Sequence, residues 1–138
     1  MTEYHIFDCG CKIPICGDNK TTVDGIPSLD LSFQNIPLDC SATWCLLTEG
    51  KVTGCFQLES QLGKAWSRKV KPSCIDDASA LVAIIRPSCL NSSLDGKSMS
   101  QHYTDRKDGT EDYENFHAEA DEILDATYGV ILYQEQSI

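Results

Sequence analysis

An almost continuous run of apolar side chains makes residues 75–86 the most strongly patterned segment of the chain. The run contains Ala78, Leu81, Val82, Ile84 and Ile85. A helix that is apolar around its whole circumference is buried in a protein core. Residues 73–76, Ser-Cys-Ile-Asp, resemble a capping box with aspartate in place of the usual glutamate, and Pro87 ends the segment. The pattern predicts a buried helix over residues 75–86.

Two helices are expected before it. Residues 38–49 carry apolar side chains at helical spacing, with Asp39 or Ser41 as the cap and Gly50 as the stop. The next helix starts after Ser60, a typical N-cap, and runs to the Lys-Pro pair at residues 71–72. Its apolar positions are Leu62, Ala65, Trp66 and Val70.

Two helices are expected after it. Residues 99–107 favour a short helix, and residues 117–127 favour an amphipathic one with Gly129 as its left-handed C-cap. The side chains expected to face inward from the second are Ile123, Leu124 and Thr127.

Strand signals are weaker and short. Residues 4–7 and 12–15 predict a hairpin across the turn at residues 8–11. Residues 52–58 read as a short buried strand, and residues 130–133 as a strand or the start of a helix. The segments expected to be loops are residues 17–28, 88–100 and 108–115.

Composition narrows the class of protein. The chain has 138 residues, one domain's worth, and 41% of them are hydrophobic, as in ordinary globular proteins. A run of 18 apolar residues is absent from the sequence, which excludes a membrane span, and the N-terminal residues do not resemble a secretory signal. We expect a cytoplasmic protein.

Charge is distributed unevenly. The net charge is −10, which opposes general attraction to DNA. Residues 51–107, however, carry 9 basic and 5 acidic side chains, whereas residues 108–138 carry 9 acidic and no basic ones. A mildly basic centre between acidic ends fits part of a nucleotide- or DNA-handling surface better than a free-standing DNA-binding protein.

Eight cysteines are many for a cytoplasmic protein. Without a signal peptide, reduced thiols or a metal site are favoured over a disulfide framework. The candidate zinc ligands are Cys9, Cys11 and Cys16, with Cys40 or Cys45. Their spacing is weak support, because structural zinc prefers pairs separated by two to four residues and Cys9 and Cys11 are separated by one.

Several phrases together resemble one family. Gly-Cys-Phe-Gln-Leu-Glu-Ser at residues 54–60 precedes Lys-Pro at 71–72, Ala-Leu at 80–81 and Arg-Pro at 86–87, and Tyr-Gln-Glu-Gln stands at 133–136. Their order and spacing resemble the fingers region of C-family replicative DNA polymerases, the alpha subunit of bacterial DNA polymerase III and its phage relatives. Ser88 and Cys89 depart from this pattern, which has Gly-Pro there.

The resemblance implies an α+β fold, mainly α-helical with a few short strands. Residues 37–138 would be the fingers-like segment, and residues 1–36 an irregular, cysteine-rich segment. In the complete polymerase, palm carboxylates hold two Mg²⁺ ions for nucleotidyl transfer. The chain lacks the family's paired aspartates, and Asp8 is only a weak candidate for a further palm carboxylate. We therefore expect the isolated chain to be inactive.

The resemblance also suggests binding roles. Arg86, Arg106 and Lys107 would contact the triphosphate of the incoming nucleotide, and Tyr133, Gln134 and Gln136 would lie near it. The expected contacts to the DNA backbone are Lys64, Arg68, Lys69 and Lys71. Alternatively, Arg86 caps its own helix, and the other cations are solvated or paired with neighbouring aspartates.

Three functional hypotheses follow for a bacterial or phage-infected cell. The first is a polymerase fragment, one part of a split gene, that binds DNA and deoxynucleotides together with a complementary polymerase chain. The second is a non-catalytic module that docks on a replisome protein. The third is a small zinc-binding protein that depends on its N-terminal cysteines.

Overall fold

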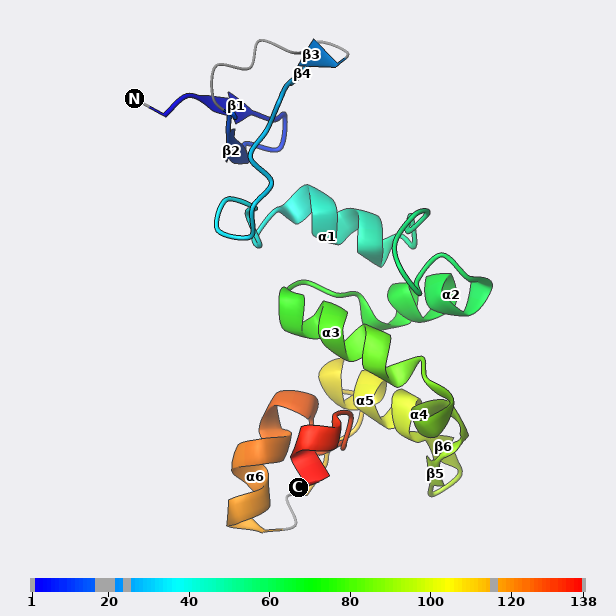
Figure 1. Cartoon of the computed structure of the whole chain (residues 1–138). Coiled ribbons are helices and arrows are strands. Elements are labelled where there is room, and N and C mark those ends of the chain that lie inside the picture. Colours follow the sequence, from blue (N-terminus) through cyan, green and yellow to red (C-terminus); the bar gives the residue numbers. More distant parts are fainter. Residues whose placement is uncertain (1, 17–21, 24–25, 115–116, 138) are drawn as a thin grey trace. The chain divides into compact units, whose positions relative to one another are not determined.

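The computed structural model describes residues 2–16, 22–23, 26–114 and 117–137. They form two compact units, residues 1–43 and residues 44–138. Both units are small, and the second contains most of the helices (Figure 1). The predicted class, mainly helical with a few short strands, is confirmed.

The first unit is built from short antiparallel strands. β1 (Tyr4–Ile6) pairs with β2 (Lys12–Pro14), which confirms the predicted hairpin. A second pair, β3 (Thr22–Val23) and β4 (Ile26–Pro27), lies in the segment expected to be a loop. The loop prediction was therefore wrong for these strands, and the rest of residues 17–25 lies outside the described residues. Ile13, at the centre of β2, is buried.

Helices α1 (Ser41–Thr48) and α2 (Gln61–Val70) occur where the sequence predicts helices. The Ser60 hydroxyl accepts a hydrogen bond from the Gly63 N–H at 3.0 Å, as expected of an N-cap. At the other end Lys71 adopts a left-handed conformation, and its N–H donates to the Ser67 carbonyl. The side chains of Trp66 and Val70 enter the core of the second unit, whereas Ala65 is exposed.

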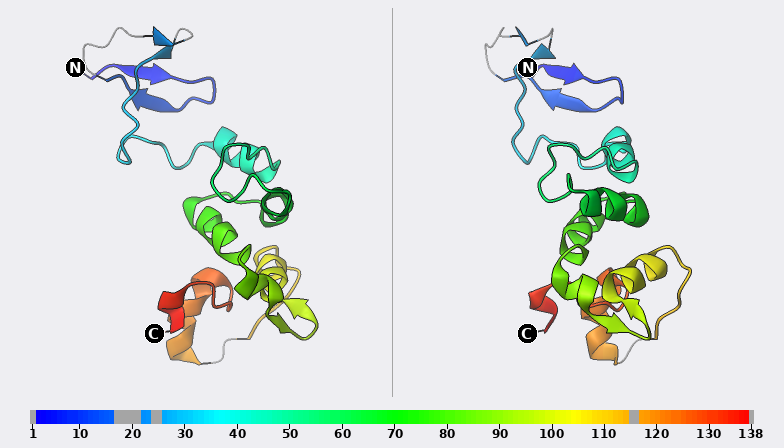
Figure 2. Two further views of the ribbon diagram at one scale, coloured as in Figure 1. Left: turned by 45° about the vertical axis from the view of Figure 1, so that its right-hand side comes forward. Right: turned by 90° about the vertical axis from the view of Figure 1, so that its right-hand side faces the viewer.

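Helix α3 (Ile75–Ile84) lies at the centre of the second unit. It is followed by α4 (Pro87–Asn91), a hairpin of β5 (Ser93–Leu94) and β6 (Lys97–Ser98), and α5 (Met99–Lys107). The hairpin lies beside α4 and α5 in both views of Figure 2. The prediction of a loop over residues 88–100 was wrong, because Pro87 starts a helix as readily as it ends one. The core residues include Val70, Leu81, Ile84 and Tyr103.

The capping box expected at residues 73–76 is displaced by one residue. Asp77, not Asp76, accepts hydrogen bonds from the Ser73 N–H at 2.8 Å and the Ser73 hydroxyl at 2.9 Å. Cys74 is the N-cap residue and makes no side-chain capping bond. Asp77 is buried, so these bonds satisfy a carboxylate that would otherwise be costly to bury.

Residues 52–58 form two successive turns and not the predicted strand. The Cys55 N–H donates to the Val52 carbonyl at 3.0 Å, and the Leu58 N–H donates to the Cys55 carbonyl at 3.1 Å. The third residue of each turn, Gly54 or Gln57, has a positive φ. Such turns return the chain to the core every third residue, which explains why Val52 and Leu58 are buried without strand pairing.

The C-terminal part contains α6 (Ala118–Leu124) and two 3₁₀ helices, η1 (Asp125–Thr127) and η2 (Gln134–Ser137). Residues 130–133 belong to no strand or helix, so both predictions for them were wrong. Thr127 faces inward as expected, whereas Ile123 is 51% exposed and does not. Tyr128 and Gly129 both adopt left-handed conformations after η1.

Candidate functional site

Four basic side chains lie in α2 or directly after it, namely Lys64, Arg68, Lys69 and Lys71, and most have partners within the chain. The Lys69 ammonium lies 4.5 Å from the centre of the Trp66 ring, and Arg68 Nε donates to the Glu49 carbonyl at 3.1 Å. Lys64 makes no ion pair with any residue in the described part of the chain. These side chains remain at the surface, half-buried or exposed, where phosphates can reach them.

The C-terminal ends of α2 and α5 meet near the N-terminal end of α3. Lys71 Nζ lies 3.9 Å from Asp108 Oδ2, and Lys107 Nζ lies 3.4 Å from Asp77 Oδ2. Burial raises the pKa of Asp77, but the hydrogen bonds from Ser73 and the charge of Lys107 outweigh it, so this pKa lies below its ordinary value. Two cations predicted to bind phosphates, Lys71 and Lys107, therefore lie beside carboxylates of their own chain.

Arg106 is the most constrained of the predicted phosphate ligands. Its Nε donates to Glu111 Oε1 at 2.8 Å, its terminal nitrogen Nη1 donates to the Tyr128 carbonyl at 3.1 Å, and its guanidinium lies over the Tyr113 ring. The side chain is only 12% exposed. This geometry gives Arg106 a structural task, and its predicted contact with a nucleotide stays a prediction.

Glu111 gathers three cationic or proton-donating groups in the acidic loop after α5. Arg106 Nε, His102 Nδ1 and Lys97 Nζ lie 2.8, 2.6 and 3.0 Å from its carboxylate oxygens. Burial raises the pKa of Glu111, but these three hydrogen bonds outweigh it and lower the pKa to about 2. The sequence reasoning missed this cluster. The only signal in the sequence was the acidic character of residues 108–115, which does not indicate which cations lie beside them.

A cavity of about 960 Å³ opens beside this cluster. Its walls combine charged groups with apolar side chains of the hairpin and the C-terminal segment, among them Leu94, Met99, Leu124 and Ile131. His102 Nε2 lies 2.9 Å from the Leu94 carbonyl, so both nitrogens of this buried ring are already held. The charged groups of the Glu111 cluster that line the cavity are thus satisfied by partners within the chain.

Arg86 differs from the other predicted phosphate ligands. It is the N-cap residue of α4, directly after buried α3, and Pro87 follows it as the first helical residue. Its carbonyl accepts hydrogen bonds from the N–H groups of Cys89 and Leu90, both at 3.1 Å, which fixes its backbone. Its side chain is exposed and makes no ion pair within the described residues.

The residues expected near the incoming nucleotide lie around η2. Gln136 uses both ends of its amide. Its oxygen accepts from the N–H groups of Leu132 and Tyr133 at 2.8 and 2.9 Å, and its nitrogen donates to the Ile123 carbonyl and the Thr127 hydroxyl at 3.1 and 2.8 Å. Gln134 is exposed. Gln136 thus fastens η2 to the end of α6, and the nucleotide role of all three stays a prediction.

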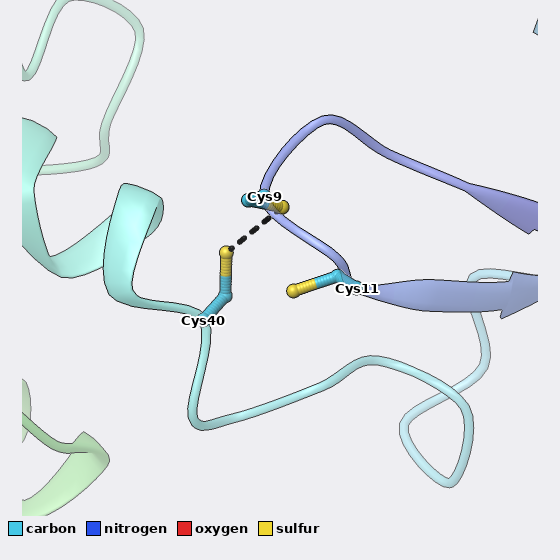
Figure 3. A group of neighbouring side chains, drawn as sticks. All are labelled: Cys9, Cys11 and Cys40. Carbon is cyan, nitrogen blue, oxygen red and sulfur yellow. Dashed lines mark hydrogen bonds between the residues drawn. The ribbon is translucent and has the colours of Figure 1, made fainter.

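Three of the five candidate zinc ligands are close together in the first unit. The sulfur atoms of Cys9, Cys11 and Cys40 lie within 4.8 Å of one another and face a common space (Figure 3). Hydrogen bonds from the Thr43 hydroxyl and N–H lower the pKa of the Cys40 thiol to about 6. Cys16 does not belong to this group, and neither does Cys45, whose sulfur contacts Glu49 at 3.5 Å.

Asp8 is exposed in the turn between β1 and β2. Within the described residues, the three cysteines are the one group of side chains arranged to share a metal ion. Magnesium prefers carboxylate and other oxygen ligands, so this group does not fit the Mg²⁺ ions of a polymerase. No helix in the described part of the chain is long and apolar enough to cross a membrane.

Known proteins resemble most of this chain. The family model of the bacterial DNA polymerase III alpha subunit finger domain matches residues 18–138. DNA polymerase III subunit alpha of Aquifex aeolicus is 44% identical over 108 residues, which are 78% of this chain and 9% of that protein. The proteins of the same name from Pasteurella multocida and Escherichia coli K12 are 42% and 38% identical over 124 residues, 86% of this chain and 10% of each relative.

The chain thus spans about a tenth of the length of these relatives. The match includes every phrase on which the resemblance was based, from the turns at residues 54–60 to η2, and confirms it. Four of the predicted ligands precede the matched residues, namely Asp8, Cys9, Cys11 and Cys16. With 121 of its residues aligned to the family model, the chain belongs to the finger-domain family of the bacterial DNA polymerase III alpha subunit.

Proposed function

We propose that this chain forms part of the fingers of a polymerase III alpha-type DNA polymerase, where it binds the incoming nucleotide and the DNA backbone. Family membership supports this function over a free-standing interaction module or a small zinc protein. Because the chain spans about a tenth of its relatives, it would act together with the rest of a polymerase. DNA and deoxynucleotides would then be its partners in the assembled enzyme.

The main support for this proposal is the side chain of Arg86. A guanidinium binds two phosphate oxygens at once through its planar fork of N–H groups. Arg86 is exposed, stands on a fixed backbone at the end of a buried helix and has no competing carboxylate within the described residues. Arg106 and Lys107 lack this freedom because Glu111 and Asp77 hold them.

The basic side chains of α2 suit a second, weaker role. Lys64, Arg68 and Lys69 lie at the surface of one helix, as expected for a contact with a phosphate backbone. The net charge of −10 opposes non-specific attraction, so we expect the isolated chain to bind DNA poorly. The contact would form where the rest of the polymerase already holds the duplex.

Large apolar side chains at the surface support a partner within the polymerase. Phe56, in the turns between α1 and α2, is 85% exposed, and Phe33 in the first unit is 91% exposed. Aromatic side chains are enriched at protein interfaces relative to the rest of the surface. The rest of the polymerase would cover them, and its carboxylates would hold the Mg²⁺ ions that activate the primer hydroxyl.

A chimaeric alpha subunit tests the role of Arg86. The chain replaces the aligned segment in the Escherichia coli K12 relative, and primer extension is measured against deoxynucleotide concentration. We expect Arg86→Ala to raise the KM for the nucleotide at least tenfold and Arg86→Lys to recover part of the loss. Lys51→Ala, at an exposed cation paired with Glu49, is the matched control and should leave the KM unchanged. An unchanged KM in Arg86→Ala would show that Arg86 does not bind the nucleotide.

A further inference from the structure

The three-cysteine group of the first unit has no explanation in packing. Cys9 is exposed, and Cys11 and Cys40 are only half-buried. An unliganded structural cysteine is usually buried as a small apolar side chain. Packing in the core therefore does not explain why three thiols lie together at the surface, and a shared ligand would explain it.

The distances suit a thiolate-bound metal. The sulfur atoms of Cys9 and Cys40 lie 3.7 Å apart, and those of all three cysteines lie within 4.8 Å of one another. In a tetrahedral zinc site, Zn–S bonds of about 2.3 Å place neighbouring sulfur atoms about 3.8 Å apart. A small inward movement of Cys11 would complete three corners of such a tetrahedron.

The local backbone explains how two cysteines separated by only one residue, Cys9 and Cys11, can bind the same metal ion. The two cysteines flank Gly10, which has a φ of +85° in the turn between β1 and β2. The Gly10 N–H donates to the Phe7 carbonyl at 2.7 Å, and the Phe7 N–H donates to the Cys11 carbonyl at 3.0 Å. This tight turn presents both sulfur atoms toward Cys40, which directly precedes α1 (Figure 3).

We propose that Cys9, Cys11 and Cys40 bind one zinc ion as thiolates, with an exchangeable fourth ligand such as water. Thiolates are soft ligands that select zinc over magnesium or calcium. Each cysteine loses its proton to solvent when the metal binds, and no oxidation is involved. The ion would join the β1–β2 turn to the segment before α1. This would stabilise a unit in which few of the described residues are apolar and buried.

Cobalt titration of the reduced full-length chain tests the proposal. Co²⁺ bound by three thiolates gives an intense sulfur-to-metal charge-transfer band and the visible bands of a tetrahedral site. We expect one equivalent to bind, Zn²⁺ to displace it, and Cys9→Ser, Cys11→Ser and Cys40→Ser each to weaken binding at least tenfold. Cys16→Ser is the matched control from the same unit and should bind normally. Less than a tenth of an equivalent of metal, or equal losses in Cys9→Ser and Cys16→Ser, would overturn the proposal.

Alkylation of the unmodified chain gives an answer that does not depend on the folding of variants. We expect Zn²⁺ to slow the alkylation of Cys9, Cys11 and Cys40, mapped by mass spectrometry, and to leave Cys16 and Cys74 unaffected. Uniform alkylation with and without zinc would overturn the proposal. So would a Cys9–Cys40 disulfide in the purified chain that, once reduced, leaves a protein unable to bind metal. Neither result would affect the proposed polymerase function, which rests on the second unit.

Discussion

Arg106 Nη1 donates a hydrogen bond to the carbonyl of Tyr128, 22 residues later in the chain, at 3.1 Å. The bond joins α5 to the left-handed turn at Tyr128 and Gly129. Because Arg106 Nε also binds Glu111, one guanidinium holds both the acidic loop and the C-terminal segment. Helix α5, the acidic loop after it and the C-terminal segment that leads to Tyr-Gln-Glu-Gln at residues 133–136 are therefore held together by one side chain.

Replacing Arg106 by alanine should destabilise the second unit by about 1.5–3 kcal/mol, because the hydrogen bonds that this charged, largely buried group donates are lost. Arg106→Lys should recover little, since one ammonium cannot reproduce the two separate nitrogens of the guanidinium. Denaturant unfolding followed by the fluorescence of the two tryptophans, Trp44 and Trp66, measures the change. The control Lys64→Ala should stay within about 0.5 kcal/mol of wild type. Equal stability of Arg106→Ala and Lys64→Ala would contradict this account.

Acid should weaken the fold through Glu111. Its pKa in the folded chain is about 2, below its ordinary value of 4.5. A lowered pKa means that the stabilisation is present above pH 4.5 and is lost as the pH falls toward 2. Glu111→Gln should therefore be less stable than wild type at neutral pH, and the difference should shrink over this range. Thermal unfolding at a series of pH values measures it, with exposed Glu114→Gln as the control. A difference in stability between Glu111→Gln and wild type that does not vary with pH would contradict the lowered pKa of Glu111.

Gly63→Ala should destabilise the chain although alanine favours helices. A Cβ at this position would lie 2.5 Å from the Leu58 carbonyl oxygen and 2.7 Å from its Cα, and backbone atoms cannot move aside cheaply. We expect the steric clash to cost about 1–3 kcal/mol, near the upper end because backbone atoms are involved, which exceeds the gain of about 1 kcal/mol in helix propensity. Chemical denaturation checks this against Gln61→Ala, an exposed change in the same helix. Stabilisation by Gly63→Ala would show that the turns and α2 are less tightly packed than described.

Gln136→Glu should detach η2 from α6. A carboxylate still accepts hydrogen bonds from Leu132 and Tyr133 but cannot donate to Ile123 and Thr127. The loss of both donated bonds should cost about 1–3 kcal/mol. Hydrogen exchange of the N–H groups at residues 132–136 should become faster. The neighbouring variant Gln134→Glu, at an exposed side chain, should leave it unchanged. Identical hydrogen-exchange rates in the two variants would contradict the structural role of Gln136.

Sequence patterns predicted the helices well because their signals are local. The Ser60 cap, the apolar run of α3 and the bounds of α5 depend only on neighbouring residues. The strand predicted at residues 52–58 failed because apolar residues three apart can also arise from two consecutive turns. The charge cluster at Glu111 was not predictable, because it requires Lys97, His102 and Arg106 to meet a loop through tertiary packing.

The sequence indicates which side chains could bind a phosphate or a metal ion, but not which of them are free to do so. The sequence proposed Arg86, Arg106 and Lys107 together as phosphate ligands. Only the structure distinguishes the exposed Arg86 from the two cations that carboxylates already hold. Likewise, five cysteines were candidates, and the fold brings three of them together.

Primer extension by the chimaeric Escherichia coli K12 alpha subunit, with this chain in place of the aligned segment, tests the central claim most directly. If the chain is a fingers segment, the chimaera should extend a primer in a template-dependent, Mg²⁺-dependent reaction, whereas the subunit with the segment deleted should not. A folded chimaera that binds primer–template but adds no nucleotide would contradict the claim that this chain can serve as the fingers of a polymerase.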